Sequence, residues 1–276
     1  MISKQRAEMI REMAEEIGIE ATAKKLKLNP ESVTRYARRV SDNKKASTKP
    51  ILVIPDTHIP YHEPDMIPFL KWVQQSRGCR KRVIHVGDLM DFHSMSFHTS
   101  EPDAPSPAEE YERALEVVAE FATSFPHGDL VLGNHDNIPS RKMMDSSLAP
   151  SMLKRNNELF GLPKGWDVHP LYYVVPEWNV LVEHGIGSNG KMGCLNTAIV
   201  KRCSYVQGHT HSNASVMYSS NYNSTIFGMN VGCLADDSSL AVRYAKYHVK
   251  KGVLGCGVIH SAEHAEFVPI ESWKNR

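Results

Sequence analysis

The sequence has no long hydrophobic run. No apolar stretch approaches the ~20 residues that a membrane-spanning helix requires. The first residues are polar and amphipathic, unlike the hydrophobic segment of a secretory signal. We therefore expect neither membrane insertion nor secretion, and we expect the protein to be cytoplasmic.

Cysteine is scarce as well. The five cysteines are scattered, and none forms a Cys-x-x-Cys pair. This pattern excludes a disulfide framework and a zinc knuckle, so we expect reduced thiols. Net charge is also nearly absent, at +1 for the whole chain, but residues 1–50 hold twelve Lys or Arg against seven Asp or Glu. A basic N-terminal segment on a mildly acidic body favours a polyanionic partner near the N-terminus.

The basic segment has the periodicity of three short helices, interrupted at Gly18 and at the turn Asn29-Pro30. Residues 1–42 resemble a helix-turn-helix domain whose last helix contacts DNA. The residues expected to bind nucleic acid are Arg35, Arg38 and Arg39. Protein binding or oligomerisation is the alternative role for these helices, and the oligomeric state stays open. Residues 43–49 are polar and aperiodic, which predicts a linker to a main domain at 50–276.

The main domain begins with strands that alternate with helices. Such alternation predicts parallel strands with right-handed crossovers, and ligands then bind beyond the carboxyl ends of the strands. Ser106 to Glu109 forms a capping box for the second helix. The predicted strands are 51–54, 83–86 and 129–132, and the predicted helices are 64–76 and the segment after Ser106.

A less regular half follows. Residues 138–170 predict a polar, helix-rich insertion. Apolar runs then predict a second series of strands, at 180–182 and 205–206. We expect 226–231 and 252–259 to be further strands that complete this second sheet.

Five short motifs of Asp, Asn and His follow these apolar runs. Carboxylates and imidazoles without thiolates suit divalent ions such as Mn²⁺, Fe²⁺ or Zn²⁺. Two ions bound side by side would hold a phosphoryl group and activate a bridging water, with Asp88 able to bridge both ions and a histidine as acid for the leaving group. The motifs are Asp56-Thr57-His58, Gly87–Asp91, Gly133–Asp136, Glu183-His184-Gly185 and Gly208–His211.

The series DxH, GDxxD, GNHD, H and GHTH resembles the calcineurin-like metallophosphoesterase superfamily over roughly residues 50–270. The resemblance implies a two-sheet α/β sandwich flanked by helices and two divalent ions, with manganese expected first and iron, zinc, nickel or magnesium as alternatives. It assigns one metal to Asp56, His58, Asp88 and His211. It assigns the second metal to Asp88, Asn134, His184 and His209. It makes His135 the general acid, oriented by Asp91, with Asp136 supporting the ligands from behind.

The sequence departs from the protein phosphatases of that superfamily at two positions. Those enzymes have Arg after GDxxD and Glu after GNH, where this chain has Phe92 and Asp136. We therefore expect a phosphodiesterase that cleaves nucleic acid, most simply DNA, by in-line attack of a metal-bridging hydroxide. The helix-turn-helix joined to a GNHD body also resembles metallophosphoesterases of bacteriophages. The alternatives are hydrolysis of small nucleotides or phosphomonoesters, and a non-catalytic binding module.

Overall fold

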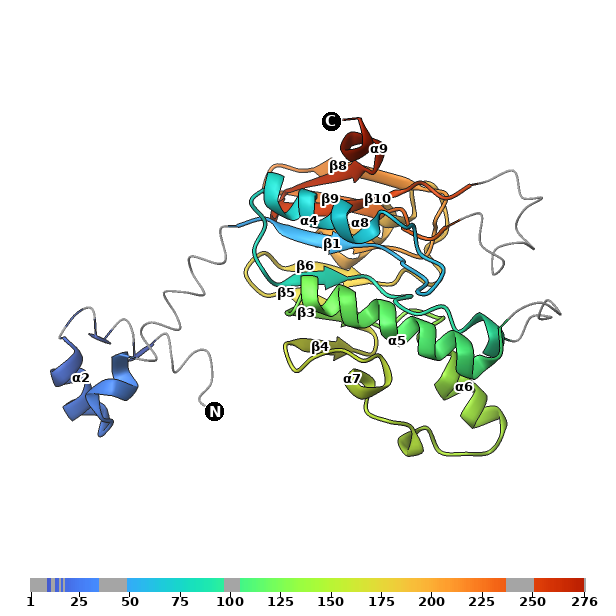
Figure 1. Ribbon diagram of the computed structural model, residues 1–276. Coiled ribbons are helices and arrows are strands. Elements are labelled where there is room, and N and C mark those ends of the chain that lie inside the picture. Colours follow the sequence, from blue (N-terminus) through green and yellow to red (C-terminus); the bar gives the residue numbers. More distant parts are fainter. Residues whose placement is uncertain are drawn as a thin grey trace. The chain divides into compact units, whose positions relative to one another are not determined.

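The computed structural model describes residues 9–10, 13–14, 16, 18–34, 49–96, 105–236 and 251–275. The chain divides into two compact units, Met1–Lys49 and Pro50–Arg276. Within the described part of the chain, no helix is long and apolar enough to cross a membrane. Figure 1 shows the course of the chain.

The first unit has a small apolar core of its own. Its helix α2 (Ile19–Leu26) ends at Lys27, whose backbone is left-handed. Ile10, Ala23 and Val33 are buried together. The expected linker lies almost wholly outside the described residues, as do Arg35, Arg38 and Arg39.

The first sheet of the second unit has the strand order β11-β10-β1-β2-β3-β4. The four strands β1 to β4 are parallel, and β10 joins the edge of β1 in antiparallel orientation. The predicted parallel arrangement is therefore confirmed. The strands are β1 (Ile51–Ile54), β2 (Val83–His85), β3 (Gly128–Val131), β4 (Trp166–His169), β10 (Gly255–Ser261) and β11 (His264–Pro269).

The second sheet has the order β5-β6-β7-β9-β8. Its central strands β6, β7 and β9 are parallel, and the outer strands are antiparallel to them. The strands are β5 (Tyr172–Val175), β6 (Val180–Glu183), β7 (Tyr205–Gln207), β8 (Ala214–Ser220) and β9 (Thr225–Val231).

Alternate residues of the strands separate two cores. Leu52 and Ile54 of β1 face the helices α4 (Met66–Ser76) and α5 (Pro107–Ser124), whereas Ile51 and Val53 face the second sheet. Helix α8 (Gly193–Lys201) packs on the outer side of the second sheet, where Ala198 is buried. The layers are therefore helix, sheet, sheet, helix, and the predicted two-sheet α/β sandwich flanked by helices is confirmed. In Figure 1, α4 and α5 lie in front of the first sheet.

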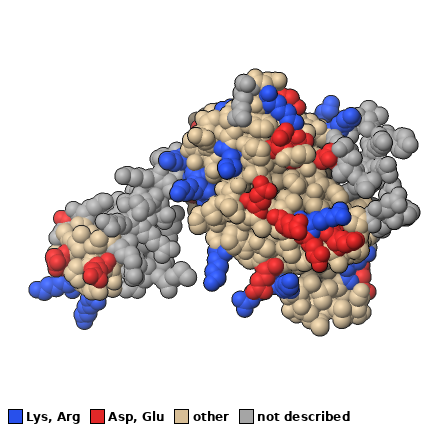
Figure 2. All heavy atoms as spheres, viewed as in Figure 1, with Lys and Arg blue, Asp and Glu red and all other residues tan. Residues whose placement is uncertain are grey.

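Helix α5 (Pro107–Ser124) begins at a capping box that the sequence supplies. Ser106 accepts a hydrogen bond from the Glu109 amide, and the Glu109 side chain accepts one from the Ser106 amide, so the predicted capping box is confirmed. Acidic side chains gather along the exposed face of α5 (Figure 2). The helices and 3₁₀ turns are α4 (Met66–Ser76), η1 (His93–Met95), α5 (Pro107–Ser124), α6 (Ile138–Asp145), η2 (Pro150–Met152), α7 (Asn156–Leu159), α8 (Gly193–Lys201) and α9 (Glu271–Lys274).

One strand that the sequence predicts for the second sheet lies in the first sheet. Residues 252–259 were expected to complete the second sheet, but their strand β10 pairs with β1 in the first sheet. The 138–170 insertion also contains β4, which extends the first sheet beside β3. Both errors have one physical cause: an apolar run predicts a buried strand without indicating its neighbours, because pairing is a long-range contact.

Candidate metal centre

Parallel strands deliver the five motifs to one region. Asp56 and His58 follow β1, Asp88 follows β2, and Asn134 follows β3. The second sheet contributes His184 after β6, and His209 and His211 after β7. All are at carboxyl ends of parallel strands, the place where ligands bind in such sheets.

The backbone turns sharply at these residues. His58, Asp88 and His209 have left-handed backbones, with φ of 47°, 51° and 64°. This conformation is uncommon for residues with a side chain, and outside helix ends and turns it is often found at functional sites.

Glycine supplies the space around the carboxylates. A Cβ on Gly133 would lie 2.0 Å from Asp88 Oδ1, and one on Gly208 would lie 2.1 Å from Asp56 Oδ1. Neither distance is compatible with a side chain. The GNHD and GHTH motifs therefore require glycine at these positions, because a carboxylate lies close against the backbone there.

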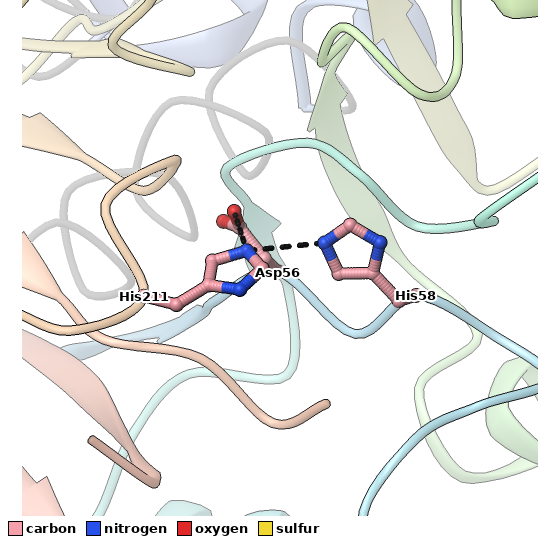
Figure 3. A group of neighbouring side chains, drawn as sticks. All are labelled: Asp56, His58 and His211. Carbon is pink, nitrogen blue, oxygen red and sulfur yellow. Dashed lines mark hydrogen bonds and ion pairs between the residues drawn. The ribbon is translucent and has the colours of Figure 1, made fainter. Parts of the chain in front are cut away.

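The first cluster contains Asp56, His58 and His211 (Figure 3). One ligand atom from each lies within 4.8 Å of the other two. His211 Nε2 is 3.1 Å from Asp56 Oδ2 and 3.1 Å from His58 Nε2, so the three side chains converge. The sequence predicted that these residues lie together, and the structure places them together.

The second cluster contains Asp88, His184 and His209, again within 4.8 Å. His184 Nε2 is 3.2 Å from Asp88 Oδ2 and 3.0 Å from Asn134 Oδ1. The Nδ1 of His184 lies 3.1 Å from the Val86 carbonyl oxygen, to which it donates. That bond leaves the Nε2 lone pair available to a metal.

Asp88 connects the two clusters. Its Oδ2 lies 3.2 Å from His184 Nε2 and 3.7 Å from His58 Nε2. Burial raises the pKa of this carboxyl, but the charge and hydrogen bond of His184 outweigh burial and hold the pKa well below its usual range. An ionised carboxylate between the clusters suits two divalent ions.

The residues fit a divalent metal. Asp56 Oδ1 is buried and has no hydrogen-bond partner among the described residues. An unpaired buried carboxylate oxygen is costly, and a cation would satisfy it. The buried His/Asp clusters, with the Asn134 amide beside them, fit a divalent-metal site. Imidazole, carboxylate and amide ligands suit several divalent metals.

His135 lies beside both clusters. Its Nδ1 is 3.0 Å from Asp91 Oδ1 and 2.7 Å from the Asp91 carbonyl oxygen. Burial lowers the pKa of His135, but the Asp91 hydrogen bond and the Asp88 charge overcome it and raise that pKa to about 10. Asp91 Oδ1 is also 2.6 Å from His58 Nδ1. Asp91 therefore orients a cluster residue and His135 together.

Asp136 lies behind the clusters. Its Oδ2 accepts a hydrogen bond from the Gly133 amide at 2.9 Å, and its Oδ1 accepts one from the Met90 amide at 3.2 Å. Burial and the Asp88 charge raise the pKa of Asp136 to about 7. The side chain joins the GNHD and GDxxD turns and is buried.

Sequence reasoning missed a buried polar network beneath the site. Thr57 Oγ1 donates to the Leu89 carbonyl oxygen and lies 3.2 Å from His85 Nε2. Burial lowers the pKa of His85 to about 3, so its ring is neutral. The signal was a histidine within a buried strand, where a polar side chain needs partners.

Residues 49–200 match the sequence model of the family described as calcineurin-like phosphoesterase. This range contains four of the five motifs, from Asp56 to His184, and ends before His209 and His211. The fifth motif, with His209 and His211, follows β7. Because β7 lies beside β6 in the second sheet, the fold brings this motif to the His184 motif. No curated protein matches the chain.

Proposed function

The chain belongs to the calcineurin-like phosphoesterase family, a family of metal-dependent phosphoesterases, and we propose that it hydrolyses phosphodiester bonds of nucleic acid. The observation that carries this choice is Phe92. It is buried and stacks on Tyr111, with ring centroids 6.3 Å apart. A position that would hold a phosphate-gripping guanidinium therefore holds an inward-facing ring.

A phosphomonoester carries two negative charges on its terminal phosphate, whereas a diester carries one. The doubly charged group gains more from a guanidinium, which binds phosphate through two hydrogen bonds. The lack of this group at Phe92 favours the diester. The basic excess of residues 1–50 supports a polyanionic substrate.

The proposed chemistry assigns each part of the site a task. Asp56, His58, Asp88 and His211 would hold one ion, and Asp88, Asn134, His184 and His209 the other. When bound, two divalent ions supply Lewis acidity and lower the pKa of water. The chain itself supplies the acid.

His135 would protonate the leaving alkoxide. Its Nδ1 is committed to Asp91, so Nε2 is the nitrogen left for the substrate. The hydrogen bond to Asp91 raises the pKa of His135, which favours the protonated ring that an acid needs, and it fixes the orientation of that ring. We call Asp91 a positioning residue because it acts through His135 and His58.

The test is hydrolysis by Mn²⁺-loaded protein of single- and double-stranded DNA, RNA, bis-p-nitrophenyl phosphate and p-nitrophenyl phosphate. His135→Ala is the matched protein, because it keeps the proposed ligands and loses the acid. We expect DNA cleavage that falls by about 10²–10⁴-fold in His135→Ala. Metal content, measured by elemental analysis, is expected to be unchanged.

Two results would contradict the proposal. Hydrolysis of the monoester with intact DNA and RNA would replace the nucleic-acid substrate with a small phosphomonoester. Equal DNA cleavage by both proteins would remove His135 from the reaction or reveal a contaminating nuclease.

A further inference from the structure

Asn230 is a buried amide in an otherwise apolar part of β9. Its neighbours along the strand, Met229 and Val231, belong to the core between the two sheets. Because side chains alternate along a strand, Asn230 points to the opposite face of the second sheet. It is only 1% exposed, and a buried amide costs free energy unless it is hydrogen-bonded. The hydrogen bonds of this side chain therefore indicate its role.

The side chain of Asn230 bonds to the GHTH motif. Its Nδ2 donates to Thr210 Oγ1, whereas its Oδ1 has no hydrogen-bond partner among the described residues. Asn230 and Thr210 are 20 positions apart, so the bond joins the end of β9 to the turn that follows β7. Thr210 thus supplies a hydrogen bond that offsets the burial of this amide.

Thr210 lies between two histidines that belong to different clusters. His209 is in the cluster with Asp88, and His211 is in the cluster with Asp56. The His209 backbone is left-handed, and its amide donates to Asp56 Oδ2 at 2.9 Å. One turn therefore contacts both clusters, and a displacement of Thr210 would move a member of each.

The strand that carries Asn230 also contacts Asp56. At Asn230, β9 is paired in register with β7 on one side and with β8 on the other. Three residues further on, Cys233 forms a parallel bridge with Asp56. The Leu234 amide then donates to the Asp56 carbonyl oxygen at 2.8 Å. The end of β9 therefore holds the main chain of one cluster residue, and its Asn230 side chain holds the turn that presents two others.

We propose that Asn230 is a positioning residue for both metal-binding clusters, and that it acts through the Thr210 hydroxyl to hold His209 and His211 in place. The inference rests on the ligands proposed above and identifies a residue outside them on which both clusters depend. Hydrogen bonds to groups just outside a metal's ligands orient those ligands and strengthen metal binding.

The test is calorimetric titration of the full-length, metal-free protein with Mn²⁺. Thr210→Val keeps the shape of the side chain and loses the hydroxyl, so we expect the dissociation constant for Mn²⁺ to rise about ten-fold or more. Thr210→Ser keeps the hydroxyl and is expected to stay within about three-fold of the wild-type value. Asn230→Ala removes the amide and should weaken Mn²⁺ binding about as much as Thr210→Val.

A double variant tests whether the two residues act through one contact. If they do, Thr210→Val combined with Asn230→Ala binds Mn²⁺ about as weakly as either single variant, because the same contact is lost only once. Independent effects would multiply instead. Thermal unfolding of the metal-free proteins shows whether each variant is folded. If Asn230→Ala does not fold, the comparison of Thr210→Val with Thr210→Ser decides.

Thr225→Val is the matched control. Thr225 begins β9, at the other end of the strand from Asn230, and it is partly buried, as Thr210 is. Its hydroxyl also bonds to a side chain, with Thr225 Oγ1 2.8 Å from Ser220 Oγ. Loss of this hydroxyl is expected to leave Mn²⁺ binding unchanged.

The outcomes separate the positioning role from the ligands and from the substrate. Wild-type Mn²⁺ affinity in Thr210→Val, or an equal loss in Thr210→Ser, overturns the role and leaves the proposed ligands intact. An equal loss in Thr225→Val, or multiplying effects in the double variant, also overturns it. Binding is measured without substrate, so these results do not depend on which ester is hydrolysed. If the wild-type protein binds no Mn²⁺, the proposed ligands fail and the positioning role with them.

Discussion

Asp136 binds two main-chain amides that belong to different motifs. Its carboxylate accepts from Gly133 after β3 and from Met90 after β2. Both turns carry residues of the clusters, so a small displacement of either would separate Asp88 from Asn134. Asp136 would thereby hold the proposed ligands Asp88 and Asn134 in place without binding an ion itself.

We expect Asp136→Asn to lower metal affinity or kcat/KM by about 10–100-fold. The amide nitrogen would replace one acceptor with a donor that faces a main-chain N–H, and that contact is repulsive. Isothermal titration with Mn²⁺ and diester hydrolysis measure the two effects. Asp145→Asn, an exposed substitution on α6, is the control. Equal metal binding and turnover in Asp136→Asn and wild type would contradict the role.

Local patterns predicted the members of the centre, because each motif needs only a strand end and a turn. Local patterns did not predict the contacts between different motifs. His58 and Asp91 are 33 positions apart, yet their side chains meet at 2.6 Å. Asp91 was expected to orient His135, and the packed structure shows that it also contacts His58. Such sharing arises from the register of β1 and β2.

Strands β3 and β4 are joined by a charged cluster as well as by their backbones. Arg82 lies before β2, and its Nε donates to Asp129 Oδ2 at 2.7 Å while its Nη2 donates to Asp167 Oδ2 at 2.6 Å. His169 Nε2 lies 2.9 Å from Asp129 Oδ1. Burial raises the pKa of Asp129, but the hydrogen bonds and charges of His169 and Arg82 outweigh burial and hold that pKa below its ordinary value.

This shift predicts a pH-dependent stability. Because the pKa of Asp129 is lower in the folded state, its carboxylate stabilises the fold above about pH 4, and that contribution disappears as the pH falls through the folded pKa. Asp129→Asn should cost about 1–3 kcal/mol of unfolding free energy at pH 7. Urea denaturation at pH 7 and pH 3 measures the difference between variant and wild type. A difference that is as large at pH 3 would contradict the mechanism.

Sequence patterns found the central strands and missed several outer ones. β1 is an unbroken apolar run buried on both faces, which is easily recognised. β8 (Ala214–Ser220) is an edge strand of alternating, partly exposed residues, and its polar members resemble a loop. β10 was recognised as a strand but assigned to the wrong sheet. Its partner β1 is about 200 positions earlier, a separation over which periodicity carries no information.

At the scale of the whole molecule, the two units have separate apolar cores. This separation allows a direct test of the proposed DNA-binding role of the N-terminal helices. Removing residues 1–48 leaves the second unit, which contains every residue of both clusters.

We expect the shortened protein to lose DNA cleavage by at least about ten-fold while hydrolysing bis-p-nitrophenyl phosphate normally. The reason is that the removed segment supplies positive charge without contributing a cluster residue. Initial rates on both substrates, measured at low and high salt, provide the comparison. Full DNA cleavage without residues 1–48 would assign the helices to another task, such as protein binding or oligomerisation.

Gly133 and Gly208 place a further requirement on the site. They carry no reactive group, yet each occupies a point where any methyl group would collide with a carboxylate oxygen. Because they lack a side chain, they leave the space in which Asp56 and Asp88 lie close against the main chain. An inventory of active residues based on acids, bases and ligands would omit both. Designers who transplant this centre to another scaffold would have to copy the vacant volume along with the side chains.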